Sequence, residues 1–189
     1  AGLRPNARTF SILIHMCARA SGTVAAGTGR GASVDEAFFW FRQMREAGET
    51  PTEVTYTTLI NACGRAGQLE RAFAVLAEMR LQGLQPNVVT YTTLIDACAK
   101  RRQLPRALAI FRDMIGAGVP PNRITCTCLF HGCLTAGEVL LAREVVQHMQ
   151  AVGLKPSAYS FTALLSATAN LDASRQHSAA VACLLRQLA

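Results

Sequence analysis

The sequence lacks the features that mark a membrane-spanning protein or a disordered tail. None of its apolar runs approaches the roughly 20 residues that a helix needs to cross a bilayer. Charged residues make up only 16% of the 189 positions, and apolar residues make up 50%. This is too little charge and too much apolar matter for an intrinsically disordered chain. The composition therefore excludes a membrane span and intrinsic disorder, and we predict no membrane partner and a folded chain with a continuous core.

The sequence also lacks the residue clusters that catalysis or metal binding requires. Cys126 and Cys128 form a C-x-C pair, but there is no C-x-x-C motif and no second pair at zinc-ligand spacing. The acidic residues are scattered, so no carboxylate cluster indicates a metal-dependent nuclease. Gly27, Gly29 and Ala32 fit a dinucleotide-binding fingerprint by letter only, because no strand precedes them. We therefore predict no metal, cofactor or small-molecule substrate, and no enzymatic activity in this chain.

Positive charge is in excess, and nearly all of it is arginine. Nineteen Lys and Arg against twelve Asp and Glu give a formal charge of +7, and seventeen of the nineteen cations are Arg. Such an excess is compatible with a polyanionic partner, although charge alone does not predict a fold.

The cysteines reveal an internal repeat. Cys63, Cys98 and Cys133 stand 35 residues apart, and Cys17 precedes Cys63 by 46 residues, which is the same interval plus eleven. One Met, one Gly, one Pro and one Ala recur with the same spacing, which is typical of a repeat architecture. Aligned on this period, the blocks begin with ARTFSILI, EVTYTTLI, VVTYTTLI, RITCTCLF and AYSFTALL. The chain is therefore predicted to contain five repeats.

The period also predicts the boundaries of the repeats. Residues 1–6 match the end of a preceding repeat, so we expect the chain to begin inside a longer array. The predicted repeats are residues 7–52, with a Gly-rich insertion at about 21–33, then 53–87, 88–122, 123–157, and a degenerate or truncated repeat at 158–189.

Each repeat has the pattern of two helices joined by a short turn. In the third repeat, apolar residues follow the i, i+3, i+4, i+7 spacing of one helical face twice. The first set is Tyr91, Leu94, Ile95 and Cys98, and the second is Leu104, Ala107, Leu108, Phe111 and Ile115. Each second helix is followed by a Gly, then a Pro, then Asn, Thr or Ser, which indicates a helix stop and the cap of the next helix. Because one hairpin cannot bury its apolar face alone, we predict an all-α fold, an α-α superhelix in the form of a right-handed solenoid.

The cysteines of the repeat are predicted to lie in its core. Cys17, Cys63, Cys98 and Cys133 share one core-facing position and behave there as small apolar residues. Neighbouring repeats would separate them by about the spacing of a helix pair, which is too far for a disulfide. We therefore predict free thiols, which are typical of a reducing compartment.

A second stripe follows each first helix about one residue step (~100°) from its core face. In the third repeat the stripe is Val89, Thr92, Asp96 and Lys100. Its order is an apolar or long side chain, a small hydroxyl, a polar group and, in three of the five repeats, a cation. The hydroxyls could cap the helices or bond back to their own backbone. Stacked stripes would also suit a single-stranded nucleic acid, with bases between the apolar residues, base edges at the hydroxyls and phosphates at the cations.

The blocks VTYTTLINACGRAGQLERAFAVLAEMRLQGLQPN and VTYTTLIDACAKRRQLPRALAIFRDMIGAGVPPN resemble pentatricopeptide repeats (PPRs) of the plain 35-residue type. The resemblance covers nearly the whole chain and is strongest from Glu53 to Asn122. The Trp and Leu-Gly signature of the related tetratricopeptide repeat is missing. The zinc deaminase domain that follows the repeats in some PPR proteins is also missing, because the chain has no H-x-E with C-x-x-C.

The resemblance implies a function and a location. PPR proteins bind single-stranded RNA in a sequence-specific way, one base per repeat, usually in organellar RNA processing, stability or translation. We therefore expect a single-stranded RNA partner and a location in the chloroplast or mitochondrion, although this chain shows no targeting segment.

The resemblance also implies roles for individual residues. In the family, the residue after the first-helix aromatic and the last residue of the same repeat read one base together. The reading pairs here would be Ser11 with Thr52, Thr57 with Asn87, Thr92 with Asn122, and Thr127 with Ser157, while Thr162 has no visible partner. The Thr-Asn combination favours adenine, so the second and third repeats should prefer consecutive adenines. The base-sandwiching residues would be Val54, Val89, Ile124 and Tyr159, and the phosphate-contacting residues Arg19, Arg65 and Lys100.

Two alternatives remain open at this point. Asn87 and Asn122 are well placed to cap the helices that follow them, and a cap alone would explain an Asn there. The concave surface of the array could also bind other proteins, as a protein-interaction or ribosome-associated scaffold.

Overall fold

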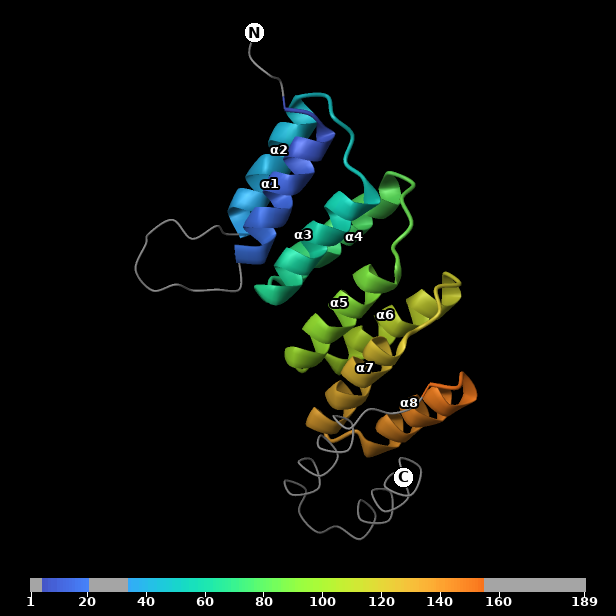
Figure 1. The fold of residues 1–189 in the computed structure, drawn as a ribbon. Helices are drawn as coiled ribbons and strands as arrows, with labels where there is room; N and C mark the ends of the chain where they lie inside the picture. The colour runs from blue at the N-terminus through green and yellow to red at the C-terminus, as the bar shows by residue number, and fades with distance from the viewer. Residues whose placement is uncertain (1–4, 21–33, 155–189) are drawn as a thin grey trace, which may run out of the picture. The chain divides into compact units, whose positions relative to one another are not determined.

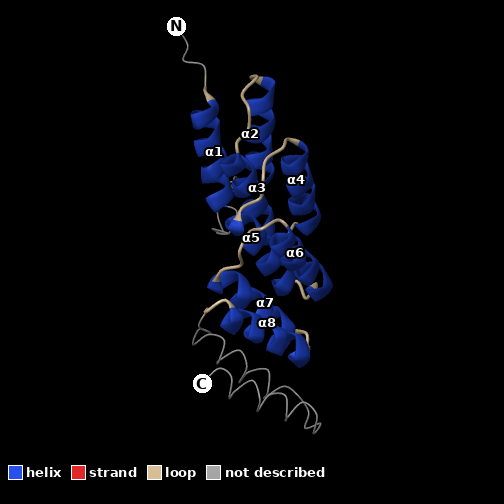
Figure 2. Ribbon diagram, turned by 90° about the vertical axis from the view of Figure 1, so that its right-hand side faces the viewer, coloured by secondary structure: helices blue, strands red, loops and turns tan. Residues whose placement is uncertain are grey.

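The computed structural model describes residues 5–20 and 34–154, and the regular elements in these ranges are all α-helices (Figures 1 and 2). They are α1 (Ala7–Ala20), α2 (Val34–Glu46), α3 (Glu53–Arg65), α4 (Leu69–Leu81), α5 (Val88–Lys100), α6 (Leu104–Gly116), α7 (Arg123–Thr135) and α8 (Val139–Ala151). None of these helices is long and apolar enough to span a membrane. The insertion at about 21–33 and the predicted fifth repeat lie outside the described residues.

The chain divides into two compact units, Ala1–Leu94 and Ile95–Ala189. In the first unit, α1 packs against α2 and α3, α2 also contacts α3, and α3 packs against α4. In the second unit, α6 and α8 both pack against α7. Each described hairpin therefore buries part of its surface against a neighbour.

Asparagine caps fix the starts of α1, α5 and α7. Asn122 Oδ1 accepts a hydrogen bond from the backbone N of Thr125 at 2.9 Å, and Asn87 Oδ1 accepts one from the backbone N of Thr90 at 3.0 Å. Asn6 makes the equivalent bond ahead of α1. These caps satisfy backbone N–H groups that have no partner inside the helix. The predicted capping role of Asn87 and Asn122 is confirmed.

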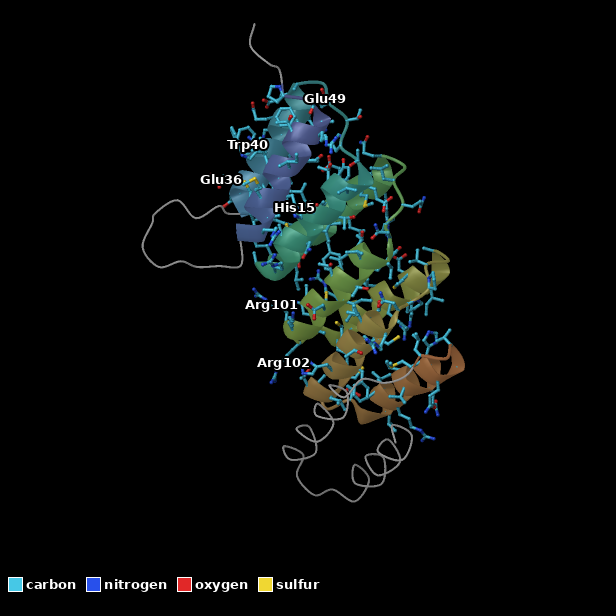
Figure 3. All side chains as sticks on the ribbon, viewed as in Figure 1. His15, Glu36, Trp40, Glu49, Arg101 and Arg102 are labelled. Carbon is cyan, nitrogen blue, oxygen red and sulfur yellow. The ribbon has the colours of Figure 1, made fainter. Side chains whose placement is uncertain are left out.

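A left-handed residue ends most of the helices. The second helices are followed by Gly48, Gly83, Gly118 and Gly153, with φ between 70° and 78°. After the first helices the same conformation occurs at Gly67 and Gly137, but the equivalent residue after α5 is Arg102, with a φ of 55°. Figure 3 labels Arg102 and its neighbour Arg101 at this end of α5. A side chain is costly in this region of φ, so the turn between α5 and α6 is strained.

The core contains the predicted face of the first helices. Tyr91, Leu94, Ile95 and Cys98 are buried, as are Cys17, Cys63 and Cys133. The described cysteines are free thiols, and burial raises the pKa of Cys63 to about 11 and that of Cys133 to about 12.

The predicted face of the second helix was partly wrong. In α6, Ile115 is 45% exposed, whereas Ile110 and Met114 are buried. The reason is that α6 packs against α7, in the next hairpin. Its buried face is therefore rotated from the one that the spacing within a single hairpin predicts.

Candidate nucleic-acid interface

Buried hydroxyls lie directly behind the candidate reading positions. Within the described ranges, the buried polar side chains are Thr55, Thr90 and Thr125, each at most 1% exposed. Each is the third residue of a first helix. A hydroxyl removed from water needs a hydrogen-bond partner, and these hydroxyls find theirs among the residues proposed to read bases.

Thr90 links the two candidate reading residues of the second repeat. Its Oγ1 lies 3.0 Å from Thr57 Oγ1 and donates to Asn87 Oδ1 at 3.2 Å. Because a hydroxyl carries one hydrogen, Thr57 must be the donor to Thr90. The Thr57 oxygen is then left as an acceptor. The Asn87 oxygen already accepts the capping hydrogen bonds, so Asn87 can offer only its amide nitrogen, which is a donor. The second repeat thus places an acceptor and a donor at its two candidate reading positions.

The first repeat has the equivalent contacts, but they are longer and their donors and acceptors are reversed. Ser11 Oγ lies 3.4 Å from Thr55 Oγ1, which lies 3.3 Å from Thr52 Oγ1. Ser11 also donates to the backbone oxygen of Ala7 at 2.8 Å. A buried threonine again contacts the two candidate reading residues, and Thr52 supplies a hydroxyl in place of an amide. Because Ser11 gives its one hydrogen to Ala7, Thr55 must be the donor to Ser11, and Thr52 the donor to Thr55.

The remaining pairs are described only in part. Asn122 Oδ1 accepts from Thr125 Oγ1 at 3.0 Å, as Asn87 does from Thr90. Its predicted partner Thr92 belongs to the first compact unit and Asn122 to the second. Thr127 Oγ1 donates to the backbone oxygen of Arg123 at 2.7 Å, so the alternative of back-bonding holds for this hydroxyl. Ser157, Tyr159 and Thr162 lie outside the described residues.

The predicted base-sandwiching residues are exposed apolar side chains. Val54, Val89 and Ile124 are 68%, 51% and 61% exposed. Each is the second residue of its helix, directly before the buried threonine and three residues before the candidate hydroxyl. The core does not use these side chains, so they are available to contact a bound molecule.

The predicted phosphate contacts lie in the last turns of the first helices. Arg19, Arg65 and Lys100 are exposed. Arg65 Nη2 donates to the backbone oxygen of Arg19 at 3.5 Å, so the Arg65 side chain reaches the last turn of α1. Lys100 forms an ion pair with Asp96 at 2.5 Å. This carboxylate offsets part of the positive charge in the third repeat.

The described residues contain no group of three or more His, Cys, Asp or Glu side chains that could hold a metal ion.

Family models match the part of the chain that carries this geometry. The model of the PPR repeat family matches residues 51–100 and 86–135, and the model of the PPR repeat matches residues 124–154. Together they cover residues 51–154, which is more than half of the 189 residues. The chain belongs to the pentatricopeptide repeat family. No curated protein matches it significantly.

Solved PPR structures share the fold of this PPR chain. PPR10 from maize is 20% identical over 99% of this chain and 25% of that one, with a TM-score of 0.80. PPR10 in complex with an 18-nt psaJ RNA element is 26% identical over 99% and 27% of the two chains, with a TM-score of 0.71. The PPR domain of Arabidopsis thaliana protein-only RNase P 1 (PRORP1), in complex with tRNA, is 16% identical over 88% and 82%, with a TM-score of 0.73.

These likenesses establish an all-α helical-repeat superhelix of the PPR type. The chain spans about a quarter of the length of PPR10.

Sequence reasoning missed two features of these PPR repeats. The first is the buried threonine, although a Thr or Ser stands third in all five aligned blocks and that recurrence was a readable signal. The second is Glu53, whose carboxylate accepts a hydrogen bond from Asn87 Nδ2. Nothing in the repeat pattern indicates this contact, because the equivalent residues in the neighbouring repeats are Ala7, Val88 and Arg123.

Proposed function

We propose that this chain binds single-stranded RNA in a sequence-specific way, one base per repeat, with adenines preferred at the second and third repeats. The observation that carries the proposal is the chain of hydrogen bonds from Thr57 through Thr90 to Asn87. It supplies an acceptor and a donor at the two reading positions of one repeat. The Watson–Crick edge of adenine has the complementary pair, an amino group that donates and a ring nitrogen that accepts.

The surrounding residues support the same function. Val54 and Val89 are exposed apolar side chains on the first helices of successive repeats, where a base can lie against them. Arg19 and Arg65 place two positive charges in the last turns of α1 and α3, where they can neutralise phosphates. The proposal assigns binding, and no catalysis, to this chain.

The structural relatives support an RNA partner. PPR10 was crystallised with an RNA element and the PPR domain of PRORP1 with tRNA. By analogy with the family, we place the chain in organellar RNA processing, stability or translation, in the chloroplast or mitochondrion.

The test is the affinity of the 189-residue chain for two RNAs that differ only in a central AA or UU, measured by fluorescence anisotropy at 50 and 200 mM salt. We expect tighter binding of the AA strand and a loss of about tenfold in affinity at the higher salt, since a few phosphates are neutralised. Equal and salt-insensitive affinities, or no binding, would contradict the proposal. Binding of a peptide in place of RNA would favour the scaffold alternative.

A further inference from the structure

The Asn87 amide is held at both of its ends. Its oxygen accepts hydrogen bonds from the backbone N of Val89 at 2.9 Å and of Thr90 at 3.0 Å. Its nitrogen donates to the carboxylate of Glu53, the first residue of α3. An amide nitrogen carries two hydrogens, so one remains for a base. Turning the amide over would break the contacts at both ends.

The third repeat has the same candidate reading residues but no carboxylate at the position equivalent to Glu53. Asn122 has a cap like that of Asn87, with Oδ1 accepting from the backbone N of Thr125 at 2.9 Å. The residue equivalent to Glu53 is Val88, which has no hydrogen-bonding side chain. Two repeats with the same Thr-Asn pair therefore differ at the position whose side chain, in the second repeat, contacts the reading residue.

The orientation of this amide decides which purine it matches. With the nitrogen presented, the amide donates to the N1 acceptor of adenine. With the oxygen presented, the amide and Thr57 are both acceptors, which matches the two donors on the Watson–Crick edge of guanine. An ionised carboxylate only accepts, so Glu53 favours the first orientation and opposes the second, which would bring two oxygens together.

We propose that Glu53 is a specificity-determining positioning residue, which locks the Asn87 amide so that the second repeat rejects guanine more strongly than the third. The inference rests on the proposed RNA-binding function. It predicts a difference between two repeats whose reading residues are identical.

The inference also predicts that the two repeats respond differently to the same substitution. Asn122→Asp puts an acceptor at the third repeat, where the residue equivalent to Glu53 is the uncharged Val88, and should move its preference from adenine to guanine. Asn87→Asp puts a second carboxylate against Glu53, and the repulsion between like charges should weaken binding of every RNA. Combining Asn87→Asp with Glu53→Gln should restore binding and give a preference for guanine.

The experiment measures the affinity of the full 189-residue chain for four RNAs that differ only in a central AA, AG, GA or GG. The variants are Glu53→Val, Glu53→Gln and Val88→Glu. Glu53→Val gives the second repeat the residue that the third repeat has at the equivalent position, Val88. Glu53→Gln keeps the shape of the side chain and can still accept a hydrogen bond from the Asn87 nitrogen. Because the Gln amide can also donate, it no longer opposes the orientation in which the Asn87 oxygen faces it. Val88→Glu introduces the equivalent carboxylate into the third repeat.

We expect both Glu53 variants to lower the preference for adenine over guanine at one nucleotide, on the order of threefold to tenfold. Val88→Glu should raise that preference at the other nucleotide, which also identifies the base that each repeat faces. Thermal unfolding checks that the variants remain folded.

Two results would overturn the inference while leaving RNA binding intact. One is an unchanged adenine-to-guanine ratio in folded Glu53→Val and Glu53→Gln. The other is an equal loss of affinity of the Glu53 variants for all four RNAs, which would mean that Glu53 only stabilises the start of α3. Failure of the unmodified chain to bind any of the RNAs would overturn the proposed function, and this inference with it.

Discussion

Thr90 contacts both candidate reading residues of the second repeat and is itself 0% exposed. Its hydroxyl accepts from Thr57 and donates to Asn87, so it sets which of these side chains is left as donor and which as acceptor. At the scale of single residues, the proposed base recognition therefore depends on a side chain that a base would not touch.

Replacing Thr90 by Val tests this dependence, because Val keeps the shape and removes the hydroxyl. We expect a loss of about 1–2 kcal/mol in the free energy of unfolding, since the hydrogen bonds to Thr57 and Asn87 are lost together. Urea denaturation measures it. The control is Thr58→Val, whose hydroxyl donates back to the Val54 backbone at 2.7 Å in a part of the helix surface open to solvent. Its cost should stay within about 0.5 kcal/mol, and equal costs would contradict the account.

The buried cysteines give a second prediction at this scale. Burial raises the pKa of Cys63 to about 11 and that of Cys133 to about 12. The reactive thiolate is therefore suppressed in the folded chain at pH 8. We expect these thiols to react with an aromatic disulfide reagent slowly in buffer and rapidly in denaturant, as followed by absorbance. Rapid reaction of both without denaturant would mean that they are not core residues.

At the scale of helices, the turn after α5 differs from its equivalents. Arg102 has a φ of 55° where Gly67 and Gly137 stand in the neighbouring repeats. Arg102→Gly should therefore raise the free energy of unfolding by about 1 kcal/mol, because glycine has no side chain to strain this conformation. Arg101→Gly is the matched control and should not stabilise, since Arg101 is not among the residues with positive φ. Thermal unfolding of both variants measures the change in stability, and an Arg102→Gly variant no more stable than the unmodified chain would contradict the strained turn.

Close packing between α5 and α7 gives another prediction. A Cβ placed on Gly132 of α7 would lie 2.9 Å from the Cβ of Ala99, which is closer than two carbons can pack. Gly132→Ala should therefore cost about 1–3 kcal/mol despite the better helix propensity of Ala. Gly116→Ala at the end of α6 meets nothing within 4 Å and should stabilise by up to about 1 kcal/mol. A stabilising Gly132→Ala would show that the two helices are less tightly packed.

The starts of the helices were predictable and some of their faces were not. An Asn cap acts on the three residues that follow it, so Asn87 and Asn122 could be identified from local sequence. The face of α6 depends on packing against α7, which belongs to a different repeat. Periodicity within one helix therefore misplaced Ile115, which is exposed, and missed Met114, which is buried.

At the scale of the whole chain, the 35-residue period was sufficient to predict a helical-repeat fold, because identical hairpins must stack to bury their apolar faces. The period also aligned the candidate hydroxyls, apolar residues and cations of successive repeats. The period could not reveal the contacts that hold these candidate residues in place. Thr57 meets Thr90 and Asn87 meets Glu53 across separations of 33 and 34 residues. Such contacts depend on how neighbouring helices pack, and for Glu53 no equivalent in another repeat signals its role.

We propose that each repeat reads one base through its two candidate residues, and Asn122→Asp tests this proposal most directly. The measurement is the affinity of the unmodified chain and of this variant for RNAs with each of the four bases at one central position after the other. We predict that the preference at a single position moves from adenine to guanine, while the neighbouring position keeps its preference for adenine. An unchanged preference at both positions would show that Asn122 is only a helix cap, and would contradict the account.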